Sequence, residues 1–295
     1  MRPLLIVALL GGCSFDWDAY DPRSTAATTS TSDAVTSSTS TPSVTVGGGG
    51  EGGQGVGGGS GGAGAGVPTD HLVAHWKLDE ASGTIVADAS GNDNGGVFIG
   101  MPQWTPGIIG GALNFPSGGS EDATDFVEIA NTVTLENVQE NDYAIAAWFK
   151  PTSVPPNTSL VNLSYTVLCK EGYHENIAYT FEQKFRYEHW LIDVSYVGVE
   201  SAIIHPPGAW YQLTAVLDRT NGIAKLYVDG VIEQTVMFPP GSQTYEYDTI
   251  PWRMGACRPG PQDYAYPTDG IVDQVRIYDR VLSDAEVTAL YQEGI

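Results

Sequence analysis

Carboxylate and amide side chains stand in two short segments, one near each end of the part of the chain that can fold. Asp79, Asp88 and Asn92 lie in the first segment and Asp273 in the second, each beside short apolar runs that predict strands. If those strands pair, the four side chains converge and offer oxygen ligands to Ca²⁺, which takes about six to eight. The other interpretation is that Asp88 and Asn92 cap tight turns, while Asp79 and Asp273 are solvated.

Aromatic side chains are the second candidate for chemistry, because exposed rings stack on the apolar faces of sugar rings. A Tyr- and Pro-rich segment predicts loops that could form such a platform, with Tyr247, Trp252, Tyr264 and Tyr266 as ligand-binding residues. The run of residues 185–190 alternates like a strand and could line a concave sheet with aromatic rings. The alternative is that Tyr and Trp fill the core of a large sandwich, with their polar tips reaching water.

The residues that catalysis needs are not arranged in a pattern that predicts an enzyme. Glycoside hydrolysis uses two carboxylates that flank the scissile bond, and the string Glu-x-Asp-x-x-Glu, which would place them on one strand, does not occur. The nearest approach, residues 171–175, predicts a loop. None of the five histidines lies in a recognisable nucleophile context. We therefore predict a protein that is not an enzyme and has no catalytic residues.

Many short strands must position these side chains. Asn221-Gly222 and Asp229-Gly230 are two-residue turn signals that predict hairpins between neighbouring strands. Ser283 and Glu286 form a capping box that predicts a short helix at the end of the chain. The clearest strand signals are residues 144–149, 212–217 and 224–228. Repeated short strands predict one all-β domain over residues 71–295, a two-sheet antiparallel sandwich with a short C-terminal helix.

The first 70 residues do not predict a folded domain. Arg2 and the apolar run of residues 4–10 have the pattern of a signal peptide, and the run is too short to span a bilayer. Residues 13–70 are rich in Thr, Ser and Gly. They cannot bury enough apolar surface to offset the entropy of ordering, so we predict a disordered stalk.

The segment Leu10-Gly11-Gly12-Cys13 resembles the lipobox of bacterial lipoproteins. The resemblance implies removal of residues 1–12, lipidation of Cys13, and an exported protein tethered to a bacterial membrane, with sorting to the outer membrane or cell surface. Acyl chains at Cys13 would be its sole membrane contact. The alternative is an ordinary secretory signal followed by an incidental cysteine. Cys169 and Cys257 could pair in an exported protein, but the sequence does not decide whether they do.

The charge of the chain narrows the choice of partners. It has 35 acidic and 13 basic residues, and its formal net charge is −22. Such an acidic surface repels phosphates, so we expect no nucleic acid partner and no contact with anionic lipid beyond the anchor. Cations, neutral sugars and basic proteins remain compatible with this charge.

Seven segments, in this order, resemble LamG-like jelly-roll domains of the concanavalin A-like lectin/glucanase superfamily. They are residues 75–80, 88–96, 110–115, 143–150, 210–217, 226–230 and 270–294. The resemblance implies a two-sheet jelly roll with a structural Ca²⁺ near the junction of its first and last strands. It does not imply one activity, because this fold hosts enzymes, lectins and adhesion modules.

We therefore predict a non-catalytic module of the cell envelope that binds a glycan or a surface protein. Two alternatives stay open. One is a carbohydrate-active enzyme with an unrecognised site, and the other is a purely structural surface protein. The sequence indicates neither the ligand nor the oligomeric state.

Overall fold

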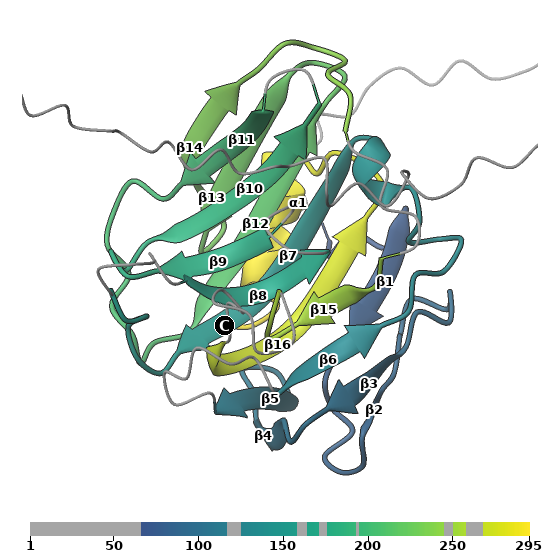
Figure 1. The fold of residues 1–295 in the computed structure, drawn as a ribbon, viewed down its shortest axis with the longest axis vertical. Coiled ribbons are helices and arrows are strands. Elements are labelled where there is room, and N and C mark those ends of the chain that lie inside the picture. Colours follow the sequence, from purple (N-terminus) through teal and green to yellow (C-terminus); the bar gives the residue numbers. More distant parts are fainter. Residues whose placement is uncertain are drawn as a thin grey trace, which may run out of the picture. The chain divides into compact units, whose positions relative to one another are not determined.

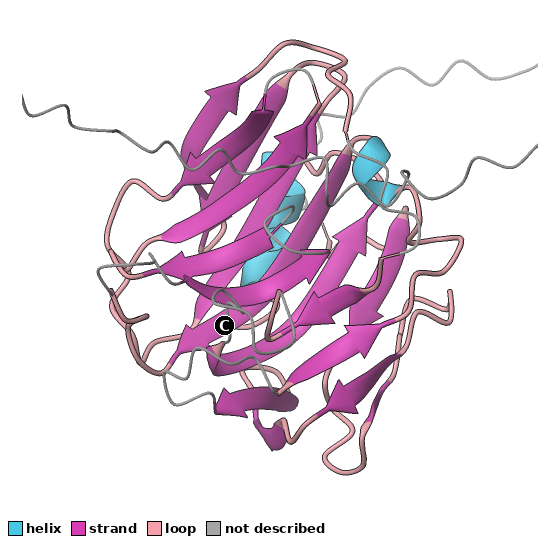
Figure 2. Cartoon of the chain, in the orientation of Figure 1, coloured by secondary structure: helices cyan, strands magenta, loops and turns pink. Residues whose placement is uncertain are grey.

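The computed structural model describes residues 66–116, 125–157, 164–170, 176–192, 195–244, 250–257 and 268–295. Within these residues, two antiparallel sheets of eight strands pack face to face, and one α-helix follows the last strand (Figure 2). This confirms the predicted all-β sandwich with a C-terminal helix. The predicted signal peptide, Cys13 and residues 13–65 of the predicted stalk lie outside the described residues.

The first sheet has the order β14-β13-β12-β7-β16-β5-β4, and β1 pairs with β16 (Figure 1). The turn signals at Asn221-Gly222 and Asp229-Gly230 connect β12 to β13 and β13 to β14, as predicted. The strands are β1 Leu72–Trp76, β4 Gln103–Pro106, β5 Gly111–Pro116, β7 Tyr143–Pro151, β12 Tyr211–Asp218, β13 Ile223–Val228, β14 Val231–Met237 and β16 Asp269–Tyr278.

The second sheet has the order β11-β10-β9-β8-β15-β6-β3-β2. A short 3₁₀ helix, Val138–Glu140, lies in the connection that leads into β7 of the first sheet. The strands are β2 Ile85–Val86, β3 Gly96–Ile99, β6 Phe126–Ile129, β8 Ser164–Lys170, β9 Asn176–Thr180, β10 Phe185–Leu191, β11 Ser195–Glu200 and β15 Trp252–Met254.

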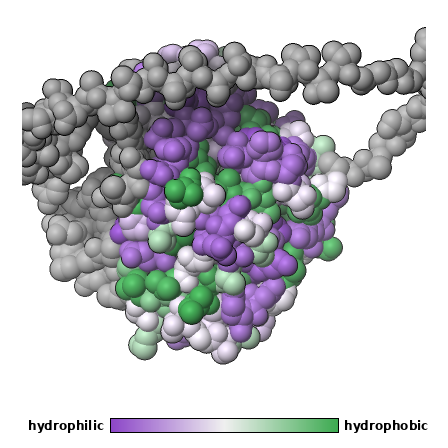
Figure 3. All heavy atoms as spheres, turned by 90° about the vertical axis from the view of Figure 1, so that its right-hand side faces the viewer, coloured by the Kyte–Doolittle hydropathy of each residue, from purple (hydrophilic) through white to green (hydrophobic). Residues whose placement is uncertain are grey.

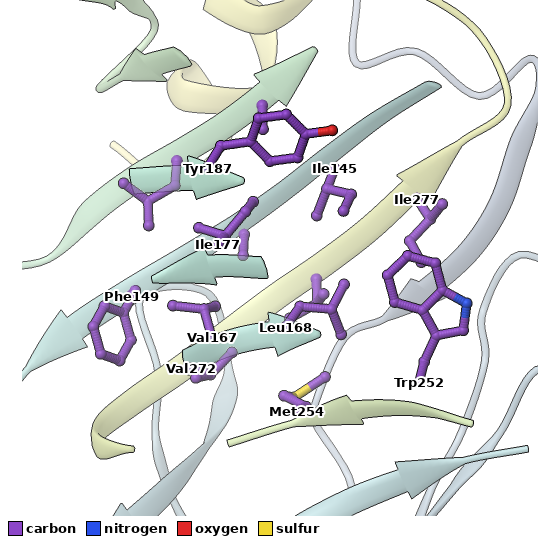
Figure 4. Packing of buried hydrophobic residues seen from close by; sticks show 14 of the residues in the cluster. Ile145, Phe149, Val167, Leu168, Ile177, Tyr187, Trp252, Met254, Val272 and Ile277 are labelled. Carbon is purple, nitrogen blue, oxygen red and sulfur yellow. The ribbon is translucent and has the colours of Figure 1, made fainter. Parts of the chain in front are cut away.

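The core lies between the two sheets and consists of large apolar side chains from the facing side of each (Figure 4). The first sheet contributes Ile145, Phe149, Val272 and Ile277. The second contributes Val167, Leu168, Ile177, Tyr187, Trp252 and Met254. Side chains alternate along a regular strand. In β8 the neighbours Val167 and Leu168 both enter the core, because the register with β9 shifts between Thr166 and Leu168. Burial of this apolar surface is the main force that holds the sheets together.

Helix α1, Asp284–Gln292, covers the outer face of the first sheet. Ser283 caps its first turn together with Glu286, as the capping box predicts, and Val287 and Leu290 pack on that face. None of the helices in the described part of the chain is long and apolar enough to cross a membrane.

The segment before β1 belongs to the folded domain and lies beside this helix. Pro68 is buried, and its carbonyl accepts a hydrogen bond from Tyr278 Oη at 3.1 Å. Asp70 pairs with Arg280 at 2.9 Å. The domain therefore begins before residue 71, because this segment packs against the end of β16.

The pairing of β1 with β16 confirms that the two ends of the domain meet. Trp76 lies opposite Val275, is fully buried and donates from Nε1 to the Asn94 carbonyl at 2.7 Å. His75 lies next to it, and its Nε2 is 2.8 Å from Gln274 Oε1. Two segments about 200 residues apart thus share one buried hydrogen-bond network.

Cys169 and Cys257 form a disulfide, which answers the question that the sequence left open. Both are fully buried, and their Cα atoms are 5.3 Å apart. Cys169 lies in β8, and β15, which pairs with β8, brings Cys257 within reach. The bond closes a loop of 88 residues.

We expect acid to destabilise the domain through His75. Burial, followed by the nearby Arg276 guanidinium, lowers the pKa of His75 to about 4 from 6.5. The unfolded chain therefore binds a proton that the folded domain excludes, and His75 favours folding above pH 6.5 by on the order of 3 kcal/mol. This contribution disappears as the pH falls from 6.5 to 4. In urea unfolding between pH 6.5 and pH 4, the free energy of unfolding should fall more steeply with decreasing pH for wild type than for His75→Gln. Parallel pH dependences of the two proteins would contradict this role of His75.

We expect removal of the disulfide to weaken the domain. A closed loop of this length restricts the unfolded chain, and the resulting stabilisation is about 2–4 kcal/mol. The double variant Cys169→Ala/Cys257→Ala should therefore melt at a lower temperature than wild type in a calorimeter. Reduced wild type should match the variant, and a melting temperature that neither change affects would show that the bond does not stabilise the fold.

Candidate functional site

Asp79 and Asp273 converge on the turn formed by residues 107–111. Asp79 Oδ1 accepts a hydrogen bond from the Gly111 N–H at 2.6 Å. Asp273 Oδ2 accepts from the N–H groups of Ile108 and Ile109 at 2.9 and 3.0 Å. The structure therefore brings together one predicted metal ligand from each end of the domain.

Two glycines in this turn make the convergence possible. A Cβ at residue 107 would collide with Asp273 Oδ2, and a Cβ at residue 110, where φ is +67°, would collide with Asp79 Oδ1. The glycine pattern of residues 107–111 was thus a sequence signal for this close approach.

Asp273 is fully buried, and only part of its carboxylate is satisfied. It lies at a bulge in β16, where the pairing with β7 shifts between residues 273 and 276. Its Oδ1 has no hydrogen-bond partner among the described residues. Burial raises the pKa of Asp273 to about 7 against the opposing N–H donors, and the charge of Asp79 adds to the rise. An unpartnered, buried carboxylate oxygen next to a second carboxylate is costly, and a cation would relieve both effects.

Asp88 and Asn92 belong to a different network. Asp88 Oδ1 accepts from the N–H groups of His75 and Ser90, and Oδ2 accepts from Ser90 Oγ and the Asn94 N–H, at 2.7–3.0 Å. Burial acts to raise the pKa of Asp88, but these hydrogen bonds outweigh it and lower the pKa below its ordinary value. Asn92 Nδ2 donates to the carbonyls of Leu72 and Val73.

The hydrogen bonds of Asp88 and Asn92 are those of residues that cap a turn, which was the alternative interpretation. The four predicted ligands therefore fall into two separate networks. Across the described ranges, no three His, Cys, Asp or Glu side chains are grouped so that they could hold one metal ion. A role of Asp88 and Asn92 as metal ligands stays a prediction.

An aromatic pair lies on the outer face of β10 and β11. Trp190 and Tyr196 stand directly opposite each other in the register of the two strands, and their ring centroids are 5.4 Å apart with planes inclined by 30°. Trp190 is half-buried, and Tyr196 is 52% exposed. We call Trp190 and Tyr196 the aromatic platform. The alternation expected for residues 185–190 is confirmed, because Phe185, Tyr187 and His189 point into the sandwich.

Gly198 explains how the ring of Tyr196 is held. A Cβ at residue 198 would lie 2.9 Å from Tyr196 Cε2 and 3.5 Å from Cδ2, so glycine leaves room for this edge of the ring. The edge of the ring thus lies against the strand, and about half of the Tyr196 side chain is exposed. Sequence reasoning missed Tyr196, although an aromatic residue two positions before a glycine in a strand was a possible signal.

Charged groups adjoin the aromatic platform on the same face. Arg186 Nε is 3.1 Å from Glu188 Oε1, and Lys184 Nζ is 2.8 Å from Glu200 Oε1 on the neighbouring strand. Burial raises the pKa of Glu188, Arg186 opposes the rise, and Glu200 adds to it. The surface therefore combines apolar rings with strong hydrogen-bond donors and acceptors.

The predicted loop platform is corrected at Trp252. This residue lies in β15, between β6 and β8, and is fully buried. The pleat turns Trp252 and Met254 into the core and leaves Arg253 on the outer face. The Trp252 ring contacts the buried Lys170 ammonium, 5.7 Å from the ring centroid. The prediction of an exposed stacking surface at Trp252 is therefore wrong. The other three predicted ligand-binding residues, Tyr247, Tyr264 and Tyr266, lie outside the described residues.

A second group of exposed apolar side chains lies at the β2 edge of the second sheet, opposite the β11 edge that carries Tyr196. Ile85 and Val97 pair across β2 and β3, and Ile99 and Met101 follow along the chain. Hydrophobic residues appear in green in the lower half of Figure 3, which faces this side of the domain. Met101 is 76% exposed. We call Ile85, Val97, Ile99 and Met101 the control surface.

A polar hollow of about 500 Å³ lies beside the start of β1. His71 and Asp279 at its rim pair at 2.7 Å, and Asn92 and Asn141 donate their amide hydrogens to backbone carbonyls. Its polar groups are thus largely engaged with one another. The aromatic platform is the better candidate for a binding surface.

Comparison with known proteins gives one family. The family model described as "Concanavalin A-like lectin/glucanases superfamily" matches residues 120–288. No curated protein matches the chain.

Solved structures share the fold at low sequence identity. The binding domain of Paraclostridial Mosquitocidal Protein 1 is 14% identical with a TM-score of 0.60, and the match covers 76% of this chain and 52% of that one. The binding domain of Botulinum Neurotoxin DC in complex with SialylT is 13% identical with a TM-score of 0.57, covering 77% and 52%. This chain thus spans about half the length of these toxin domains.

A third structure matches over nearly its whole length. It is Domain 4 of AbnA, a GH43 extracellular arabinanase from Geobacillus stearothermophilus, in complex with arabinotriose. It is 20% identical with a TM-score of 0.51, and the match covers 75% of this chain and 98% of that one. The family match extends over more than half of the chain and agrees with the two-sheet sandwich, and it shows that this chain belongs to the concanavalin A-like lectin/glucanases superfamily.

Proposed function

We propose that this protein is a non-catalytic glycan-binding module and that the aromatic platform is its contact surface. The observation that carries the proposal is the pair Trp190 and Tyr196 beside the Arg186–Glu188 ion pair. The structures with arabinotriose and SialylT support a glycan as the ligand class. The binding domain of Botulinum neurotoxin DC was also solved in complex with rat synaptotagmin II, which keeps a protein ligand as the alternative.

The platform suits a sugar for two physical reasons. A pyranose presents C–H groups on its ring faces, and stacking them on an aromatic ring removes apolar surface from water. Burial of about 60 Å² at roughly 25 cal/mol per Å² contributes about 1.5 kcal/mol for each ring. The hydroxyl groups at the rim of the sugar can then bond to Arg186 and Glu188, which provide a donor and an acceptor.

The arrangement of the domain suits display on a surface. The segment before β1 and helix α1 lie on the outer face of the first sheet, whereas the aromatic platform lies on the outer face of the second. We propose that the chain is an exported bacterial lipoprotein, anchored to the outer membrane through Cys13. A tether that enters beside α1 would then leave the platform on the opposite side of the domain.

One observation favours a second candidate function, a carbohydrate-active enzyme. Glu188 and Glu200 lie on neighbouring strands, and burial raises the pKa of Glu188, as the general acid of a glycosidase requires. Against it, each carboxylate is paired with a cation, Arg186 or Lys184. Turnover of an array glycan by wild type but not by Glu188→Gln would establish the enzyme.

We expect wild type to bind at least one glycan on a glycan array, and calorimetry would then measure the affinity of the variants for that glycan. Trp190→Ala and Tyr196→Ala should each weaken binding about tenfold, because each removes a stacking surface. Tyr196→Phe should retain binding, and Ile85→Ala, on the control surface of the same sheet, should behave as wild type. The proposal fails if no array glycan binds wild type, or if both alanine variants bind as tightly as wild type.

We also propose a structural Ca²⁺ at Asp79 and Asp273. The unpartnered Oδ1 of Asp273 and the adjacent Asp79 carboxylate fit a hard cation with oxygen ligands. Backbone carbonyls and water would complete the coordination. Such an ion would neutralise two close carboxylates and tie β16 to the turn of residues 107–111.

We expect Ca²⁺ to raise the melting temperature of protein that was first treated with EDTA. Binding at one hundred times Kd stabilises the folded state by about 2.7 kcal/mol. Asp273→Asn keeps an acceptor for Ile108 and Ile109 but loses the charge, so it should not respond. Asp88→Asn should still respond, because Asp88 lies in the other network. Wild type that does not respond, or Asp273→Asn that does, would refute the site.

A further inference from the structure

A groove runs along the side of the domain where the two sheets end. It lies between β11 and β14, the last strands of their sheets in the described part of the chain, and has a volume of about 440 Å³. Its lining residues are Tyr196, Val197, Gly198, Val236, Met237, Phe238 and Pro239.

The groove is continuous with the aromatic platform. Tyr196 faces Trp190 on the outer face of the sheet and also lines the groove. Gly198, which leaves room for the edge of the Tyr196 ring, lines the groove as well. Among the described residues, Tyr196 therefore joins the platform directly to the groove, and a ligand that extends past it would enter the groove.

The two parts of this surface differ in chemistry. The platform has the Arg186–Glu188 pair beside it, whereas none of the seven residues that line the groove is charged. Met237 is 78% exposed, and Phe238 packs against the core below it. One end of the surface thus suits hydroxyl groups and the other suits a hydrocarbon.

We infer that the ligand is a glycoconjugate, with its sugar on the aromatic platform and its apolar aglycone in the groove. This inference rests on the proposed function and names the class of glycan. An alkyl or aryl aglycone would cover Met237 and the exposed edge of Phe238. Water would leave an apolar surface on both partners, which adds affinity to that of the sugar alone.

An extended peptide that adds a strand at this edge is the less favoured occupant. Strand addition needs a continuous row of backbone donors and acceptors. Residues 239 and 240, which follow β14, are both proline and have no N–H to donate. Glu233, in the middle of β14, is turned toward His205 at 2.9 Å, and the register with β13 shifts there. The β14 side of the groove is thus poorly suited to a new strand.

The test compares methyl and hexyl glycosides that share the same sugar. We would titrate wild type with the methyl and the hexyl glycoside of β-D-glucose, β-D-galactose and α-L-arabinofuranose. Each hexyl glycoside would be kept below its critical micelle concentration. For a sugar that binds, the hexyl form should bind about tenfold more tightly, as burial of roughly 55 Å² of apolar surface predicts.

Matched variants locate the effect. Met237→Ser should lose most of the gain from the hexyl group and bind the methyl glycoside as wild type does. Met101→Ser, at a methionine of nearly equal exposure on the control surface, should keep the full gain. Trp190→Ala should weaken both glycosides.

Each contrary result has a distinct meaning. Equal affinity for methyl and hexyl glycosides, or a gain that survives Met237→Ser, would overturn the inference and leave the glycan-binding proposal intact. If no glycan on the array binds to wild type, both the glycan-binding proposal and the glycoconjugate inference are overturned. Binding of an extended apolar peptide that Met237→Ser abolishes, with equal affinity for the two glycosides, would instead assign the groove to a protein partner.

Discussion

The pairing of β16 with β1, β5 and β7 is the interaction on which the rest of the domain depends. It brings the first strand, the last strand and the middle of the chain into one sheet (Figure 1). Helix α1 and the segment that contains Pro68 both pack at the end of β16. Long-range pairing of this kind costs loop-closure entropy, which the buried core and the disulfide offset.

A bulge in the same strand places a carboxylate where the sheet would otherwise carry an apolar residue. The register of β16 shifts after Asp273, and the side chain is received by two backbone N–H groups of the turn at residues 107–111. The other oxygen of the Asp273 carboxylate, Oδ1, has no hydrogen-bond partner among the described residues. The proposed Ca²⁺ site would therefore couple ion binding to stability at this point, whereas Asp88 stabilises β1 by accepting the His75 N–H.

The aromatic residues of β10 and β11 show how one strand serves both the core and the surface. Tyr187 enters the sandwich, while Trp190 stays on the outer face with Tyr196. Cross-strand packing of the two rings and the room that Gly198 leaves for the edge of Tyr196 hold this pair on the two strands. A binding surface built on strands is more rigid than one built on loops, which favours recognition at low entropic cost.

The sequence by itself determined the strand pattern, the hairpins at Asn221-Gly222 and Asp229-Gly230, and the helix that Ser283 caps. These depend on local alternation and turn chemistry, which neighbouring residues fix. Only the tertiary structure decided which carboxylates converge, that Trp252 is buried, and that Tyr196 completes the platform. These properties depend on the order and register of strands distant in sequence, and a shift of one residue would turn each side chain to the opposite face.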